Sequence, residues 1–263
     1  MRLYTSILIR VILLSECLEA IEMKTGARKK SGFSLVEVMI ATGILTIGFA
    51  FIAGVFPVGI KLVASATETT MAPIVEQEAF AKIRLYGVDD SVLTAWPIDS
   101  GTGNPLTLVY GNAATTAAFN LDELDYPSAV VTDDKNYSWS AICRYVGGAS
   151  GRDVEVTVFV SRKAGAGARP MPVKVGVLFN PLVPALLQID PAANPRQILT
   201  GSTIVDDATG YVYEVVGRGA TIDIIELDRD WAGGNGSVWV VPPAAGSSRN
   251  PCIGVYWHEP EGF

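Results

Sequence analysis

One carboxylate, Glu37, stands inside a stretch of apolar residues. It belongs to the segment KKSGFSLVEVMIA, which covers residues 29–41. An ionisable side chain at membrane depth is costly, so by default it marks a function. The chemistry open to such a carboxylate is to pair with a cation. The alternative, in which Glu37 only reaches the lipid headgroups, stays open.

The element that positions Glu37 is the apolar run that follows it. Residues 38–60 form 23 consecutive positions without a charge, and about 20 apolar residues span a bilayer as a helix. Arg28, Lys29 and Lys30 stand just before the run. Because basic flanks stay on the cytoplasmic side, the sequence places its carboxyl-terminal bulk outside.

Two other interpretations of the apolar run remain open. A buried core helix is seldom this long and this uniformly apolar. A cleaved secretory signal is more serious, because Ala64-Ser65-Ala66 resembles its cleavage site. The apolar part of such a signal usually runs only about 7–15 residues. A retained membrane helix is therefore the favoured prediction.

The segment KKSGFSLVEVMIA resembles the cleavage and methylation motif of type IV pilins and type II secretion pseudopilins. The resemblance implies that a prepilin peptidase cuts between Gly32 and Phe33 and methylates the new amino terminus of Phe33. It gives Glu37 a role in subunit assembly. The implied partners are other pilin or pseudopilin subunits, the prepilin peptidase, and an assembly platform in the inner membrane.

The segment before the cleavage point, residues 1–32, is long for such a leader. Met23 offers a simpler start, because the leader would then read MKTGARKKSG, which is short and basic. A genuinely long leader is the alternative, and the sequence leaves both open.

The fold class predicted for the rest of the chain is α+β. One helix is expected over 33–86, with its transmembrane part at 33–60, and Pro57 and Pro73 should kink or locally melt it. A β-rich head is expected over 87–263, built mainly as an antiparallel sheet, and the segment 203–241 reads as one meander. The predicted strands are 106–110, 137–146, 154–161, 173–179, 185–189, 203–205, 211–216, 221–227, 238–241 and 253–257.

Chemistry elsewhere in the chain is sparse. His258 is the single histidine, and we predict that it is a surface residue. The sequence has no G-x-S-x-G motif of a serine hydrolase. Its glycine clusters do not match a phosphate-binding loop. Two acidic loops, 133–136 and 228–235, could hold calcium but read better as solvated turns. We predict no enzyme activity, no metal and no cofactor.

Charge and cysteines add two expectations. The residues after position 32 carry 14 basic and 24 acidic side chains, so no nucleic-acid partner is expected. After cleavage, which would remove Cys17, only Cys143 and Cys252 remain. They could form a disulfide in an oxidising compartment, or be two unrelated buried thiols.

The predicted function is structural. The subunit would cross the inner membrane once, hold its head in the periplasm, and then enter a pilus or pseudopilus, in a minor role. One alternative is a membrane-anchored periplasmic binding or adhesive domain that never enters a filament. Another is an envelope enzyme with an unrecognised site.

Overall fold

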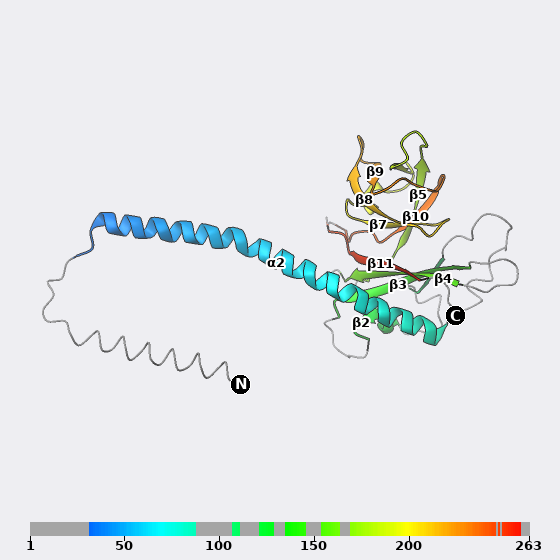
Figure 1. Ribbon diagram of the computed structural model, residues 1–263, viewed down its shortest axis with the longest axis horizontal. Helices are drawn as coiled ribbons and strands as arrows, with labels where there is room; N and C mark the ends of the chain where they lie inside the picture. Colours follow the sequence, from blue (N-terminus) through cyan, green and yellow to red (C-terminus); the bar gives the residue numbers. More distant parts are fainter. Residues whose placement is uncertain are drawn as a thin grey trace. The chain divides into compact units, whose positions relative to one another are not determined.

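The computed structural model describes residues 32–87, 107–110, 121–128, 135–145, 154–163, 169–245, 247 and 249–258. The chain divides into two compact units, Met1–Lys61 and Leu62–Phe263. A long helix is followed by a head of strands (Figure 1). The elements in chain order are α2 (Leu35–Tyr86), β1 (Thr107–Tyr110), η1 (Leu121–Leu124), β2 (Asp125–Tyr126), β3 (Tyr137–Tyr145), β4 (Val154–Arg162), β5 (Val173–Phe179), β6 (Leu186–Ile189), η2 (Pro195–Gln197), β7 (Thr203–Asp206), β8 (Val212–Arg218), β9 (Ile224–Leu227), β10 (Gly236–Val240) and β11 (Cys252–His258).

Helix α2 has the predicted extent. It ends where Gly87, at φ 73°, turns the chain into the left-handed region and donates its N–H to the Ile83 carbonyl at 2.8 Å. Glycine suits this position because it has no Cβ to clash there. Neither Pro57 nor Pro73 melts the helix, since α2 is helical through both, so of the two predicted effects only a kink stays a prediction. Each interior proline removes one backbone hydrogen bond and crowds the carbonyl four residues before it, so the rest of this long helix has to offset that cost.

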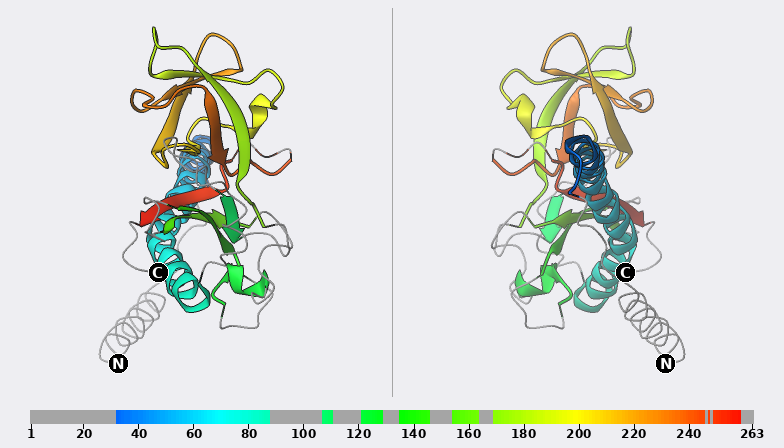
Figure 2. Two further views of the ribbon diagram at one scale, coloured as in Figure 1. Left: turned by 90° about the vertical axis from the view of Figure 1, so that its right-hand side faces the viewer. Right: turned by 90° about the vertical axis from the view of Figure 1, so that its left-hand side faces the viewer.

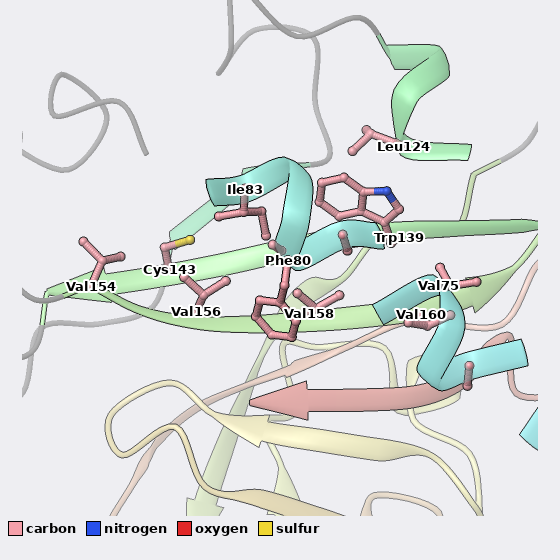
Figure 3. Close-up of a cluster of buried hydrophobic side chains, with 13 residues drawn as sticks. Val75, Phe80, Ile83, Leu124, Trp139, Cys143, Val154, Val156, Val158 and Val160 are labelled. Atoms are coloured by element: carbon pink, nitrogen blue, oxygen red, sulfur yellow. The ribbon is translucent and has the colours of Figure 1, made fainter. Parts of the chain in front are cut away.

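The upper part of α2 packs on a five-stranded antiparallel sheet. The sheet has the order β1-β3-β4-β11, and β2 pairs with the first two residues of β3, Tyr137 and Ser138. In Figure 3 the helix side chains Val75, Phe80 and Ile83 point at the valines of β4. These helix residues recur at helical spacing, which gives the helix one apolar face. The shared cluster contains Ala72, Val75, Ala79, Phe80, Ile83, Leu124, Trp139, Ala141, Cys143, Val154, Val156, Val158 and Val160.

The remaining strands close into a small barrel of order β10-β5-β6-β9-β8-β7. Closure pairs every strand on both sides and so removes exposed sheet edges. Figure 2 shows the barrel on the side of the sheet away from the upper part of α2. Its interior holds Val175, Val177, Leu187, Ile189, Ile198, Ile204, Tyr213, Val215, Ile225, Leu227, Trp231, Val238 and Val240.

The barrel is an insertion into the sheet. The chain leaves the sheet after β4 and returns in β11, which pairs directly with β4. The two connections lie together, because Arg162 donates its N–H to the Pro251 carbonyl at 2.8 Å. On the barrel side, β5 and β10 pair through Val173 and Val240. Insertions with adjacent ends leave the host fold intact.

The structure confirms the antiparallel head and most of the predicted strand positions. The prediction that residues 203–241 form one meander was wrong at its last strand. Strands β7, β8 and β9 are consecutive neighbours, whereas β10 pairs with β7 and β5 instead of β9. Pairing with β5 closes the barrel, and the strand pattern alone carries no information about a partner so distant in sequence.

The structure contradicts the Cys143–Cys252 disulfide, since both thiols are free and buried. Cys143 pairs with Val156 of β4, and Cys252 pairs with Ser161 on the opposite flank of that strand. At about 3.3 Å per residue, these two positions of β4 are roughly 16 Å apart along the strand. A disulfide needs Cα atoms within about 7 Å. The alternative of two unrelated thiols describes the structure.

Thiol titration is expected to find two free thiols per mature chain in denaturant without reductant. In the folded protein both should react slowly, because the thiolate is the reactive form. Burial raises the pKa of the Cys143 thiol strongly and raises that of Cys252 to about 12. Absence of titratable thiols in the unfolded chain would restore the disulfide.

A buried carboxylate, Asp125 of β2, ties the edge of the sheet to the chain after β4. Lys163 donates to its Oδ2 at 2.9 Å and Arg169 donates to its Oδ1 at 2.7 Å. Burial alone would raise the pKa of Asp125, but the hydrogen bonds and charges of Arg169 and Lys163 outweigh it, so the pKa is lowered. The ionised network therefore stabilises the folded head.

Asp125→Asn is expected to cost about 2 kcal/mol near neutral pH, because it leaves two cations without their shared anion. The contribution of a carboxyl with a lowered pKa is complete above its unfolded value, about 3.9, and is lost as the pH falls below that value. Unfolding followed by near-ultraviolet circular dichroism at pH 3 to 7 measures it. A difference between variant and parent that stays constant down to pH 3 would contradict the assignment.

Candidate processing and membrane segment

The junction of Gly32 and Phe33 directly precedes α2. A Cβ built on Gly32 meets nothing within 4 Å, and Phe33 is 81% exposed. The helix begins at Leu35, after the Ser34 carbonyl has accepted the Val38 N–H at 3.2 Å. The peptide bond between Gly32 and Phe33 thus lies outside regular secondary structure.

Glu37 lies in the first turn of α2, and its side chain is exposed. A carboxylate in the first helical turn is favourable, because it faces the positive end of the helix dipole. Its helical neighbours Val36 and Val38 are exposed apolar residues. The structure therefore shows an exposed carboxylate with helix-terminal support, flanked by exposed apolar side chains and four residues after Phe33.

The lower part of α2 exposes apolar side chains all round. The helix is long and apolar enough to cross a membrane, and none of its most apolar window is buried. Its hydroxyls are satisfied locally: Thr42 donates to the Val38 carbonyl at 2.9 Å and Thr46 to the Thr42 carbonyl at 2.7 Å. A helix that is hydrophobic all round requires an apolar environment, and the internally bonded threonines are compatible with one.

A long exposed apolar helix near the amino terminus, joined to a sheet-rich head, fits a protein anchored in a membrane by that helix. Residues 27–53 match the family model described as the prokaryotic N-terminal methylation motif. The chain therefore carries the prepilin-type signal that is the hallmark of type IV pilins and pseudopilins. No curated protein and no solved structure matches the chain significantly.

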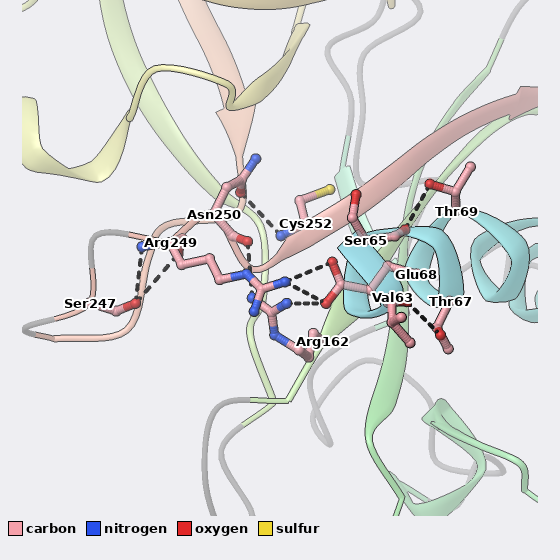
Figure 4. A network of polar contacts seen from close by, with 10 residues as sticks. All are labelled: Val63, Ser65, Thr67, Glu68, Thr69, Arg162, Ser247, Arg249, Asn250 and Cys252. Carbon is pink, nitrogen blue, oxygen red and sulfur yellow. Dashed lines mark hydrogen bonds and ion pairs between the residues drawn. The ribbon is translucent and has the colours of Figure 1, made fainter. Parts of the chain in front are cut away.

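A clamp of two arginines holds α2 on the head just beyond the apolar run. In Figure 4, Arg162 from the end of β4 and Arg249 from the loop before β11 converge on Glu68. Arg249 donates to the two carboxylate oxygens at 2.8 and 3.0 Å, and Arg162 donates to Oε1. Glu68 is only 18% exposed. The sequence shows Glu68 as one acidic residue after the apolar run, with no signal for its distant partners.

Glu68→Gln is expected to lower the stability of the head by about 1–2 kcal/mol, since breaking a partly buried pair leaves charge uncompensated. That corresponds to a melting temperature lower by roughly 2–8 °C for a domain of this size. Thermal unfolding of the mature chain in detergent measures it, with the exposed Glu226→Gln as control. Equal melting of the Glu68 variant and the parent would contradict the clamp.

The other residues singled out in the sequence lie apart from this segment. The surface reading of His258 was incomplete, because its ring lies 5.2 Å from that of Phe80 and Arg84 contacts its Nε2 at 3.3 Å. Asp228 accepts the Glu214 N–H at 2.9 Å. Positions 133 and 134 lie outside the described residues. Within the described ranges, no cluster of three or more His, Cys, Asp or Glu side chains could hold a metal.

Proposed function

We propose that this chain is a minor subunit of a type IV pilus-like or type II secretion filament. Prepilin peptidase cleaves it after Gly32 and methylates Phe33, and the apolar part of α2 then packs among the helices of neighbouring subunits. The observation that carries the proposal is the position of the methylation motif, which ends within an exposed apolar helix. Such a helix needs lipid or other helices around it.

The inserted barrel supports a minor role. A subunit needs only its helix and its sheet to stack, and here both are complete without β5 to β10. The barrel adds a second closed core to the head at the position between β4 and β11. An added domain at such a site supplies surface for a specialised contact, and a repeated major subunit has no need of it.

The test compares the protein in sheared filaments and in membranes, in cells with and without prepilin peptidase. With the peptidase, a shortened form is expected in the filament fraction, at a small fraction of the level of the main subunit. Without it, only the full-length form should remain, in the membrane. A shortened form confined to the membrane would favour the alternative, an anchored binding or adhesive domain. A chain of the same size in cells with and without the peptidase would reject both the processing and the filament role.

A further inference from the structure

A small pocket lies where the turn between β7 and β8 of the barrel meets β4 and β11 of the sheet. Its volume is about 240 Å³. Two aromatic rings are exposed at it, Tyr211 at 56% and Trp257 at 48%. Two exposed aromatic rings beside one hollow offer apolar contact surface to a ligand or partner. The lining consists of Glu155, Thr209, Gly210, Tyr211, Val212, Arg229 and Trp257.

The walls of this pocket are fixed by a buried network. Glu155 is 3% exposed. It accepts the Trp257 indole N–H at 2.7 Å and the Arg144 Nε–H at 2.7 Å. Arg144 continues to the carbonyls of Ala208 and Thr209, at 2.5 and 2.6 Å, in the turn between β7 and β8. The indole ring and the turn are therefore held in place before any partner arrives.

Gly210 is required for this arrangement. It has φ 75°, and a Cβ there would collide with the Glu155 carboxylate. Only glycine adopts this conformation at little cost and also permits the close approach.

Most polar groups that line the pocket are already used. Both oxygens of Glu155 accept hydrogen bonds, and the Trp257 N–H is donated. The Thr209 hydroxyl donates to Asp206 at 2.6 Å and accepts the Tyr211 N–H at 3.3 Å. The Glu155 oxygens can still accept, but neither the Thr209 hydroxyl nor the Trp257 indole has a donor left for a sugar oxygen, and an unpaired buried oxygen carries a free-energy penalty. An apolar ring meets no such penalty.

Arg229 supplies the exception. One of its terminal nitrogens donates to the Val212 carbonyl, and its guanidinium lies 4.9 Å from the Tyr213 ring centroid. A guanidinium carries five N–H donors in a planar fork that suits a carboxylate. The pocket thus combines two aromatic walls with one fixed cation at its margin.

We propose that this pocket binds an aromatic side chain of a neighbouring subunit, with a carboxylate of the same segment paired to Arg229. The identity of the partner as a subunit rests on the proposed filament role, whereas the chemistry of the pocket does not. The volume suits one aromatic side chain, and Trp, Tyr and Arg are the residues that dominate binding energy at protein interfaces. The inserted barrel forms one wall, which gives the insertion a purpose.

The chemistry of the pocket is tested with small probes on the full mature chain in detergent, in which the tryptophan indoles are labelled with ¹⁵N. N-acetylphenylalanine should shift the Trp257 indole resonance saturably, in the millimolar range. The uncharged amide of the probe should bind at least about fivefold more weakly, since it lacks the charge that Arg229 pairs with. N-acetylalanine and methyl glucoside should leave the Trp257 resonance unmoved. The Trp139 resonance, in the core under α2, should not respond.

Variants make the result specific to this pocket. Tyr211→Ala should abolish the shift, because it removes one wall. Arg229→Gln should retain binding but lose the preference for the acid over the amide, whereas Arg196→Gln, an exposed arginine of the same barrel, should change neither. Saturable binding of the glucoside, or no saturable binding of the acid, would overturn the proposal. So would a response that survives in Tyr211→Ala.

The partner is tested in filament-producing cells with a photo-crosslinking phenylalanine at position 211. The crosslinked product should contain another protein that carries the methylation motif, identified by mass spectrometry. The same crosslinker at Ile222, which is 60% exposed elsewhere on the barrel, should give no such product. A crosslink from position 211 to a protein without the motif, or no crosslink, would contradict the assignment of the partner as another subunit. Absence of the chain from filaments would reject the filament role and leave the probe result to stand by itself.

Discussion

Glu37→Ala and Glu37→Leu are each expected to lower the ratio of filament-borne to membrane-borne mature subunit by at least about tenfold. The proposed cleavage after Gly32 would create an ammonium on Phe33, four residues before Glu37. Among packed apolar helices, that ammonium needs an anionic partner, and loss of one member of a buried pair costs several kcal/mol. A cost of about 1.4 kcal/mol per subunit already changes an equilibrium tenfold. We propose that this pair would also fix the axial register between neighbouring helices.

The two Glu37 variants separate electrostatics from membrane affinity. The leucine side chain adds apolar surface to the anchor helix. The alanine side chain adds very little. Membrane insertion and cleavage should be intact in both, and Glu226→Ala, an exposed acidic position on the barrel, serves as control. The measurement is quantitative immunodetection of sheared filaments and membranes. Normal incorporation of both variants would make Glu37 a tolerated polar residue with no role in assembly.

Gly32→Val is expected to block processing almost completely, so that the precursor accumulates in the membrane. A peptidase that cuts between Gly32 and Phe33 has to reach the backbone there, and glycine allows the closest approach because it has no side chain. A Cβ at position 32 meets nothing within 4 Å in the free chain, so the added bulk of valine should act on the approach of the peptidase and not on the fold. The amount of full-length and shortened chain on a gel measures it.

The matched control for this substitution is Gly26→Val, which adds the same bulk six residues upstream and should leave cleavage unchanged. Efficient shortening of the Gly32 variant would show that cleavage occurs elsewhere. Shortening at Thr67 would then point to the secretory-signal interpretation, in which Ala64-Ser65-Ala66 is the recognised site.

The sequence predicted the elements well where local pattern decides. The apolar run and the spacing of Val75, Ala79 and Ile83 fix a helix that ends at Tyr86, as observed. The β-branched and aromatic segments gave the strands within a few residues of their bounds. The candidate processing segment could also be recognised from the sequence. Its leader charge, Gly-Phe junction, Glu37 and apolar length all lie within one continuous stretch of residues.

What the sequence could not supply are features that depend on distant partners. Valines alternate along strand β4 with Glu155, Thr157, Phe159 and Ser161. Such alternation is typical of a strand with one buried and one half-exposed face. Both faces are in fact buried, because the inserted barrel covers the second. Glu155 tolerates burial only because Arg144 and Trp257 pair with it. Closure of the barrel and the Glu68 clamp depend on tertiary contacts in the same way.

The disulfide failed for a related physical reason. An oxidising compartment makes a bond between two remaining cysteines plausible, but only geometry permits it. Cys143 faces α2, and Cys252 belongs to the core between the sheet and the barrel. Nothing local to either cysteine distinguishes these two faces.

The most direct test of the central claim is mass spectrometry of the amino-terminal peptide of the protein purified from its own cells. The processing account predicts a chain that begins at Phe33 and carries one additional methyl group on its amino nitrogen. A chain that begins at Met1, Met23 or Thr67, or one that begins at Phe33 without the methyl group, would contradict it.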